Sequence, residues 1–188
     1  MKKTLKVLGL LFISAALVTC DALEEADDVT FHSELEIQFI ADENGTGTNV
    51  PYDDVQLLDL SNDSEIQPYL DKIKDIEITN ITYRITGYDA SPHNNAVIFN
   101  NGIAAFGPFD TVNPTVIGNY AAGASGVNLQ TTTTETDLDI DTDQFNTVAE
   151  MLMDDKKVKM YSGGDLTQTP VAFTVVAKFY VTITANAL

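Results

Sequence analysis

The feature that most constrains this fold is a long alternation of apolar and polar residues over residues 170–187. Because successive side chains of a β-strand point to opposite faces of a sheet, a period of two predicts one long strand with a buried face. Around Val176 and Tyr180 the even positions also become apolar, which indicates a central strand whose second face is covered there by a helix. The odd, buried positions are Val171, Phe173, Val175, Ala177, Phe179, Val181 and Ile183.

The N-terminal part of the body has the same period. Residues 29–39 alternate between apolar and polar side chains and predict a first strand with one solvent-exposed face. Residues 41–49 contain two glycines and several short polar side chains, which favour turn conformations, so we expect a loop there. Residues 55–60 predict a short strand, and residues 62–65 offer caps for a helical turn over residues 66–73.

Two further segments contain local irregularities. Between residues 74 and 88 the apolar stripe changes parity after Ile78, and a β-bulge at Thr79-Asn80 would bring the whole stripe to one face. Asn101-Gly102 separates two apolar runs, and asparagine before glycine is a strong hairpin signal, so we expect a tight turn there. Shorter strands are expected near residues 115–120, 127–134 and 156–161, the last followed by a turn at residues 162–165.

One helix is predicted, over residues 141–155. Its apolar side chains recur at spacings of three and four residues, and Asp141 with Gln144 forms a capping pair. About seven to nine strands with one late helix predict an all-β fold, an antiparallel β-sandwich with the helix packed on it. The immunoglobulin pattern of two cysteines and a tryptophan is absent from the sequence, so the prediction concerns architecture and not that topology.

The first twenty residues indicate export. Lys2, Lys3 and Lys6 precede an apolar run that is too short for a comfortable membrane span and ends at Cys20, the sole cysteine. The segment Leu17-Val18-Thr19-Cys20 resembles the lipobox of bacterial lipoproteins, although glycine, alanine or serine is commoner than Thr19 before the cysteine. The resemblance implies cleavage before Cys20 and its acylation with fatty acids such as palmitate. The alternative is an ordinary signal peptide, cut elsewhere or kept as an anchor.

The resemblance divides the chain into three parts. Residues 1–19 would be the signal peptide, residues 20–28 a lipidated acidic tether, and residues 29–188 a single β-sandwich domain. The lipid bilayer is then a partner, through acylated Cys20. The acidic, threonine- and asparagine-rich body is similar to surface lipoproteins and favours an outer-membrane, cell-surface location, whereas an aspartate directly after the cysteine is similar to an inner-membrane retention signal.

The charge balance excludes one class of partner. The chain has a formal net charge of −18, and removal of residues 1–19 takes away three lysines and no acids, which gives −21. Nucleic-acid binding requires clustered lysines and arginines that contact phosphates, and Arg84 is the single arginine. We therefore expect no nucleic-acid partner.

Asp139, Asp141, Asp143 and Glu150 form the sharpest candidate metal site. Glu150 is the twelfth position counted from Asp139, which is the carboxylate spacing of an EF-hand-type calcium loop. The sixth position is Gln144, where that loop requires glycine, and the helical pattern begins directly afterwards. Capping of the helix by Asp141 or Asp143 explains the same acids, so calcium and helix capping remain alternatives.

Candidate ligand-binding residues are Arg84, Tyr88 and His93. Arg84 is expected to point outward and pair with an acid, and it could also hold a carboxylate; Tyr88 and His93 belong to a polar loop end. His32 is expected on the solvent-exposed face of the first strand. No glycine-flanked serine or free thiol suggests nucleophilic catalysis, so we expect no enzyme.

Together these patterns favour a non-catalytic surface lipoprotein that binds an unknown protein or glycan partner or takes part in envelope assembly. The alternative is a calcium-dependent, glycan-binding or glycan-degrading lipoprotein that uses loop carboxylates.

Overall fold

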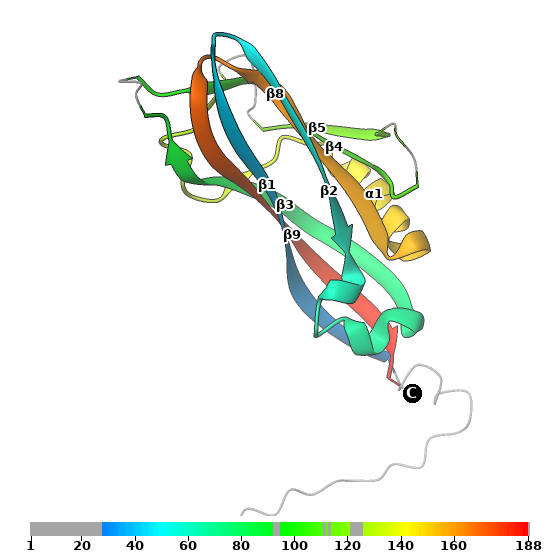
Figure 1. Cartoon of the computed structure of the whole chain (residues 1–188). Helices are drawn as coiled ribbons and strands as arrows, with labels where there is room; N and C mark the ends of the chain where they lie inside the picture. The colour runs from blue at the N-terminus through cyan, green and yellow to red at the C-terminus, as the bar shows by residue number, and fades with distance from the viewer. Residues whose placement is uncertain (1–27, 92–94, 111, 113, 121–125, 188) are drawn as a thin grey trace, which may run out of the picture.

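The computed structural model describes residues 28–91, 95–110, 112, 114–120 and 126–187. Two antiparallel sheets lie face to face around one core (Figure 1). The predicted β-sandwich with one late helix is therefore confirmed. Sheet A has the order β1 (Asp28–Gly47), β9 (Thr169–Asn186), β3 (Ile73–Asp89) and β7 (Thr136–Asp137). Sheet B has the order β2 (Val50–Asp59), β8 (Lys157–Leu166), β4 (Ile98–Pro108) and β5 (Val116–Asn119), and β6 (Val127–Asn128) also pairs with β4.

The long final strand lies inside sheet A, as the period-two pattern predicted. β9 pairs with β1 on one side and with β3 on the other over most of its length. Its odd positions point into the core, where Phe173 and Phe179 are almost fully buried. Pairing on both edges leaves no backbone edge of β9 exposed.

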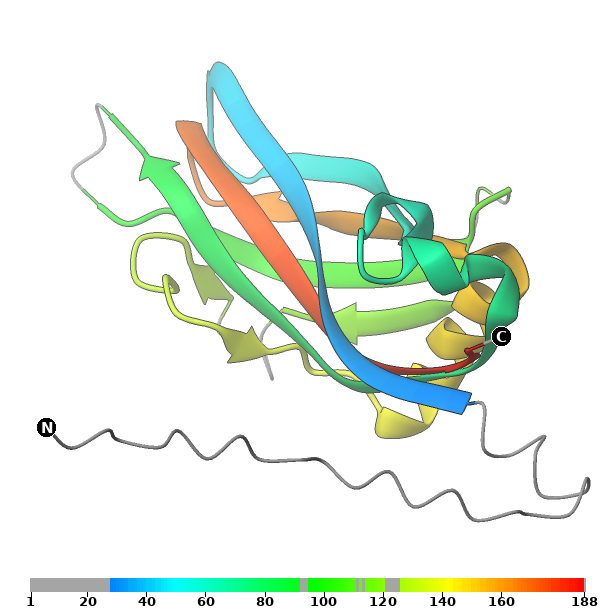
Figure 2. The same ribbon diagram turned by 90° about the horizontal axis from the view of Figure 1, so that it is seen from below.

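The helix α1 (Thr142–Asp155) occupies the predicted residues but does not cover the outer face of β9. Asp141 is its N-cap and accepts a hydrogen bond from the Asp143 backbone. The apolar side of α1 packs into the core against the beginning of β3, at the end of the sandwich where β1 starts (Figure 2). On the outer face of β9, Tyr180 instead donates a hydrogen bond to Glu135, from the segment between β6 and β7. The apolar side chains of α1 therefore belong to the core between the two sheets and do not cover the outer face of sheet A.

The predicted β-bulge in β3 is confirmed. Ile78 pairs with Val181 and Asn80 with Tyr180, so Thr79 is an extra residue without a partner position on β9. The Thr79 hydroxyl donates to the Tyr180 carbonyl at 3.1 Å. Because of this insertion the isoleucines on both sides of the bulge point into the core.

Two predicted turns are wrong, and the predicted loop over residues 41–49 is shorter than expected, because the strands continue into these segments. β4 runs through Asn101 and Gly102, where a register shift absorbs extra residues and Asn101 adopts φ 52°. β8 runs through residues 162–165; a Cβ on Gly164 would lie 2.6 Å from the Phe99 ring, so this glycine serves close packing and not chain reversal. β1 extends to Gly47, and the reversal into β2 takes place at residues 48–49.

Two short 3₁₀ segments close the other side of the same end. They are η2 (Leu60–Asn62) and η3 (Gln67–Lys72), in the region where a helical turn was predicted. Asp63 accepts hydrogen bonds from the backbones of Glu65 and Ile66, as expected of a capping residue. Leu60 and Ile66 are fully buried, so this segment adds side chains to the core.

Candidate interaction surface

The outward-facing side chains of sheet B form a mostly apolar surface, here called the sheet B face. Residues paired across neighbouring strands lie in rows, and the central row runs Val55, Tyr161, Ala105 and Ile117 across all four main strands. Leu57 and Ile103 lie in the two adjacent rows on either side. The sheet B face therefore consists of Val55, Leu57, Ile103, Ala105, Ile117 and Tyr161, together with the flanking charges described below.

Four large apolar side chains of the sheet B face are exposed. Val55 is 43%, Leu57 44%, Ile103 37% and Ile117 53% exposed. Single exposed apolar residues are normal on protein surfaces, whereas a contiguous group of them marks an interaction site. Ala105, in the same row between Tyr161 and Ile117, is only 1% exposed. The four exposed side chains form two groups, Val55 with Leu57 on β2 and Ile103 with Ile117 on β4 and β5, and Tyr161 of β8 lies between the groups.

Charged residues flank the sheet B face in an ordered way. Along the outward side of β8, Lys157 and Lys159 precede Tyr161, and Asp165 lies at the far end. Lys157 forms an ion pair with Asp59 at 2.9 Å. Burial alone would raise the pKa of Asp59, but hydrogen bonds from Ser61 and Lys157 hold the pKa of this carboxyl below its usual range. One end of the face is thus basic and the other acidic.

The outward side of sheet A is different, and is here called the sheet A face. At its centre the Lys178 ammonium lies 2.8 Å from Glu135 and 3.0 Å from Glu34. Glu36 lies 3.7 Å from Lys178 and 3.6 Å from Arg84. Three glutamates from two segments therefore surround one lysine, and the strands are linked by side-chain ion pairs. The residues of this face that are used below are Glu34, Glu36, Gln38, Arg84, Glu135, Lys178 and Tyr180.

The ion pairs of the sheet A face shift the titration of their members. Hydrogen bonds to Glu135 and Glu34 raise the pKa of Lys178. The hydrogen bond from Lys178, and after it the one from Tyr180, lowers the pKa of Glu135. The same hydrogen bond to Glu135 raises the pKa of the Tyr180 hydroxyl. The shifts of Lys178 and Glu135 favour their charged forms, as attraction between opposite charges requires, and the shift of Tyr180 favours the neutral hydroxyl that donates to Glu135.

The four predicted calcium ligands do not gather into a coordination loop. Asp139 forms an isolated β-bridge with Asn119, and Asp141 caps α1. Asp143 lies in the first turn of α1 and Glu150 two turns further on, so the backbone from Thr142 onward is helical and not a loop. Within the residues that the structure describes, no group of three or more His, Cys, Asp or Glu side chains is placed to hold a metal ion.

The predicted binding residues are distributed as follows. Arg84 points outward and pairs with Glu36, as expected. The Tyr88 hydroxyl accepts a hydrogen bond from the Val97 backbone at 3.1 Å, which ties the end of β3 to the residues that precede β4. His32 is exposed on β1, 2.9 Å from the Thr182 hydroxyl. His93 and Cys20 lie outside the described residues.

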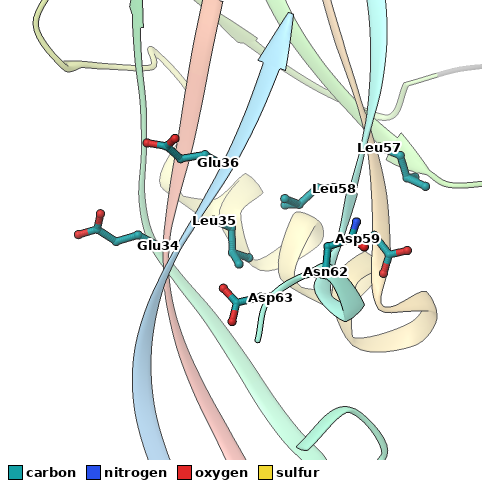
Figure 3. A pocket seen from close by; sticks show the side chains of 8 residues that line it. All are labelled: Glu34, Leu35, Glu36, Leu57, Leu58, Asp59, Asn62 and Asp63. Atoms are coloured by element: carbon teal, nitrogen blue, oxygen red, sulfur yellow. The ribbon is translucent and has the colours of Figure 1, made fainter. Parts of the chain in front are cut away.

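A hollow of about 160 Å³ lies between β1 and β2, where the edges of the two sheets separate (Figure 3). Four acids line it, but Glu34 and Glu36 point away from its centre on one side and Asp59 on the other. Asp63 accepts a hydrogen bond from Ser33, and Asp59 is paired with Lys157. These carboxylates therefore serve the local structure and do not converge on a ligand.

Sequence reasoning missed the sheet B face. Its members come from four strands, and each strand contributes only one or two outward apolar residues. The signal was the apolar character of both parities in β2, where Val55 and Leu57 point outward while Leu58 points inward. Only the register between strands shows that these residues are neighbours.

No protein-family model matches this chain, and no curated protein matches it. Two solved structures are similar at low identity. A decameric BFDV capsid protein shows 13% identity and a TM-score of 0.44 over 82% of this chain and 99% of that chain. The Desmodium yellow mottle tymovirus structure shows 8% identity and a TM-score of 0.36 over 97% of each chain. This likeness concerns the β-sandwich architecture and carries no information about function.

The described residues include no helix that is long and apolar enough to cross a membrane.

Proposed function

We propose that this chain is a lipid-anchored, non-catalytic protein of the bacterial cell envelope that binds a protein partner through the sheet B face. The observation that carries the binding role is the row of neighbouring apolar side chains, 43–53% exposed at Val55 and Ile117. The anchor rests on the resemblance of Leu17-Val18-Thr19-Cys20 to a lipobox. In this account residues 1–19 are removed, and residues 20–28 connect the acylated Cys20 to the body at the outer membrane.

The place where the chain enters the sandwich supports this arrangement. β1 begins at Asp28 beside the end of β9, at one end of the elongated body (Figure 1). The central row of the sheet B face lies on the side of the body, in the middle of β2 and β8. A tether attached at the end therefore leaves the side of the sandwich accessible to another protein.

The polar groups of the sheet A face support a non-catalytic role. Lys178 and Glu135 form an ion pair that stabilises both charges, which raises the pKa of Lys178 and lowers that of Glu135. A general base or nucleophile instead needs a pKa moved toward the working pH. The shifts are therefore those of a structural network.

Mass spectrometry of the native protein tests the anchor. We expect the mature N-terminus at Cys20, with acyl chains on the thiol and on the new amino group. Cys20→Ser should abolish both the acylation and the cleavage, and Thr19→Ala, which introduces a commoner residue, should be processed at least as fast as the wild type. An unmodified Cys20 sulfhydryl in the native protein would refute the lipid anchor.

A further inference from the structure

We propose that the partner of the sheet B face is a second copy of this chain, bound face to face. The two copies are related by a two-fold axis that runs along the central row, across the strands and parallel to the sheet. This inference rests on the binding role proposed above for the sheet B face. Three observations carry it: the order of charges along β8, the local charge balance, and the area of the sheet.

The order of charges along β8 makes the face complementary to itself. The outward residues run Lys157, Lys159, Tyr161, Gly163 and Asp165. A two-fold axis along the central row reverses the strand direction of the second copy, so the lysine end of each copy lies over the aspartate end of the other. An axis parallel to β8 would instead place lysines over lysines. An isologous contact brings the same patch of both copies together, so the charges of one patch must be complementary to themselves.

The same axis also matches side-chain sizes on β4 and β8, whereas on β2 it places Leu57 opposite Asp53 of the second copy. On β4, Ala105 lies in the central row, and the next outward residues on either side of it are Ile103 and Gly107. Lys159 and Gly163 are related in the same way on β8. The reversed second copy therefore places a long side chain opposite a glycine at both positions, and isoleucine and valine of the central row meet their own equivalents.

The local charge balance explains why an acidic protein can bind itself here. The whole chain has a formal charge of −18. On the sheet B face Lys157 and Lys159 lie beside Asp53, Asp59 and Asp165, which leaves a local formal charge of −1. Contact between two copies through this face therefore avoids most of the repulsion that the net charge would otherwise produce.

The size of the sheet suits a specific dimer. The strands β2, β8 and β4 have 10, 10 and 11 residues, whereas β5 has 4. With about 4.8 Å between strands and about 3.3 Å per residue, they give a face of roughly 550 Å² per copy. Both copies together reach roughly 1,100 Å², just above the roughly 1,000 Å² expected of a specific protein–protein interface. Sheets packed face to face lie about 10 Å apart, with their side chains interdigitated.

Cross-linking of the full-length protein in native membranes tests the dimer. Ile117→Cys and Val55→Cys place a thiol in the central row, where each residue faces its own equivalent in the second copy, within reach of a short bis-maleimide. Gln38→Cys is the matched control, because Gln38 is exposed on the sheet A face. We expect a cross-linked product of twice the monomer mass for both sheet B variants, at least tenfold more abundant than for Gln38→Cys. Equal yields for the two faces, or a product with a different protein, would overturn the proposal.

The wild-type chain separates this inference from the proposed function. Its sole cysteine is Cys20, so an acylated chain cannot react with the maleimide. A cross-link in the wild type would refute the lipid anchor, whatever the sheet B variants show. A silent wild type together with silent Ile117→Cys and Val55→Cys variants would refute the dimer and leave the anchor intact.

Charge reversal tests the orientation of the second copy. In the Val55→Cys background, Lys157→Asp or Asp165→Lys alone should lower the cross-linking yield about tenfold, because like charges then face each other. The combination of both substitutions restores opposite charges across the axis and should recover most of the yield. Single reversals without any effect on the yield would contradict this orientation.

Discussion

Both sheets are built from antiparallel strands, but the outward side chains of the two sheets differ in kind. On the sheet A face, the register places Glu36 of β1 opposite Lys178 of β9, and Glu135 reaches the same lysine from outside the sheet. On the sheet B face, the register places Val55, Tyr161, Ala105 and Ile117 in one row. The side chains of the sheet A face form ion pairs with one another, whereas several apolar side chains of the sheet B face remain exposed to solvent. The identity of cross-strand neighbours, and not strand propensity, makes this difference.

The two faces also differ in how much their side chains contribute to folding. The outward apolar side chains of sheet B add little to the stability of a monomer, since much of their surface is still in water. The ion pairs of sheet A contribute within the monomer, although exposed ion pairs contribute little each. Substitutions therefore distinguish a face that contributes to folding from the face for which we propose association.

The largest expected effect contrasts the inner and outer sides of sheet B. Phe106 is fully buried and its ring contacts Phe179, whereas Ile117, on the paired strand β5, is 53% exposed. Phe106→Ala should lower the free energy of unfolding by about 3–5 kcal/mol, and Ile117→Ala by about 0.5 kcal/mol or less in the monomer. Urea denaturation at low protein concentration measures both. Similar losses for the two variants would show that Ile117 is part of the monomer core.

The next effect is the dependence of stability on concentration. Because a dimer is stabilised by mass action, each tenfold rise in protein concentration should add about 1.4 kcal/mol per dimer to the stability of the wild type. The double variant Val55→Lys with Ile117→Lys should show no such dependence. Thermal unfolding over three decades of concentration measures this. A concentration-independent Tm in the wild type would contradict a dimer.

A smaller effect is expected on the sheet A face. Lys178→Met removes the cation that offsets the repulsion among Glu34, Glu36 and Glu135. This substitution should lower the free energy of unfolding by about 1 kcal/mol or less. High salt should reduce the difference, because mobile ions screen the repulsion between the glutamates. Urea denaturation at low and high salt measures this, with Gln38→Met as the control. A loss that does not change with salt would indicate that Lys178 acts through packing.

The smallest expected effect is on the pH dependence. The pKa of Glu135 is lowered in the folded state, so its contribution is present above the ordinary value of 4.5 and is lost as the pH falls through the lowered pKa. The pKa of Lys178 is raised, so its contribution is present below 10.5 and is lost only as the pH rises through the raised pKa. Lys178→Met should therefore lose less stability than the wild type between neutral pH and about pH 3. Tm measured against pH tests this, and parallel curves would argue against the Glu135–Lys178 pair.

The sequence predicted those parts of the fold that depend on local periodicity. The central position of β9, the bulge at Thr79, the helix α1 and its cap Asp141 all follow from patterns within one segment. The predicted turns at Asn101-Gly102 and at residues 162–165 were wrong for a common reason. Glycine permits a turn, and it also permits close contact with a neighbouring side chain. Here the neighbour of both segments is the ring of Phe99, and a pattern within one segment gives no information about such a contact.

The candidate site was predictable only in part. The outward direction of Arg84 and its pairing with an acid follow from strand parity and are confirmed. The sheet B face requires the register of β2 with β8 and of β8 with β4, which no single segment encodes. The acylation of Cys20 remains a prediction from the sequence.

Hydroxyl-radical footprinting of the anchored protein in native membranes tests the central claim most directly. Tyr161 and Tyr180 are both half-buried and lie outward on interior strands of sheets B and A, so each is the reference for the other. We predict that oxidation of Tyr161 is several-fold slower in the wild type than in the Val55→Lys, Ile117→Lys variant, while Tyr180 reacts equally in both. Equal oxidation of Tyr161 in the two proteins would mean that nothing covers the sheet B face.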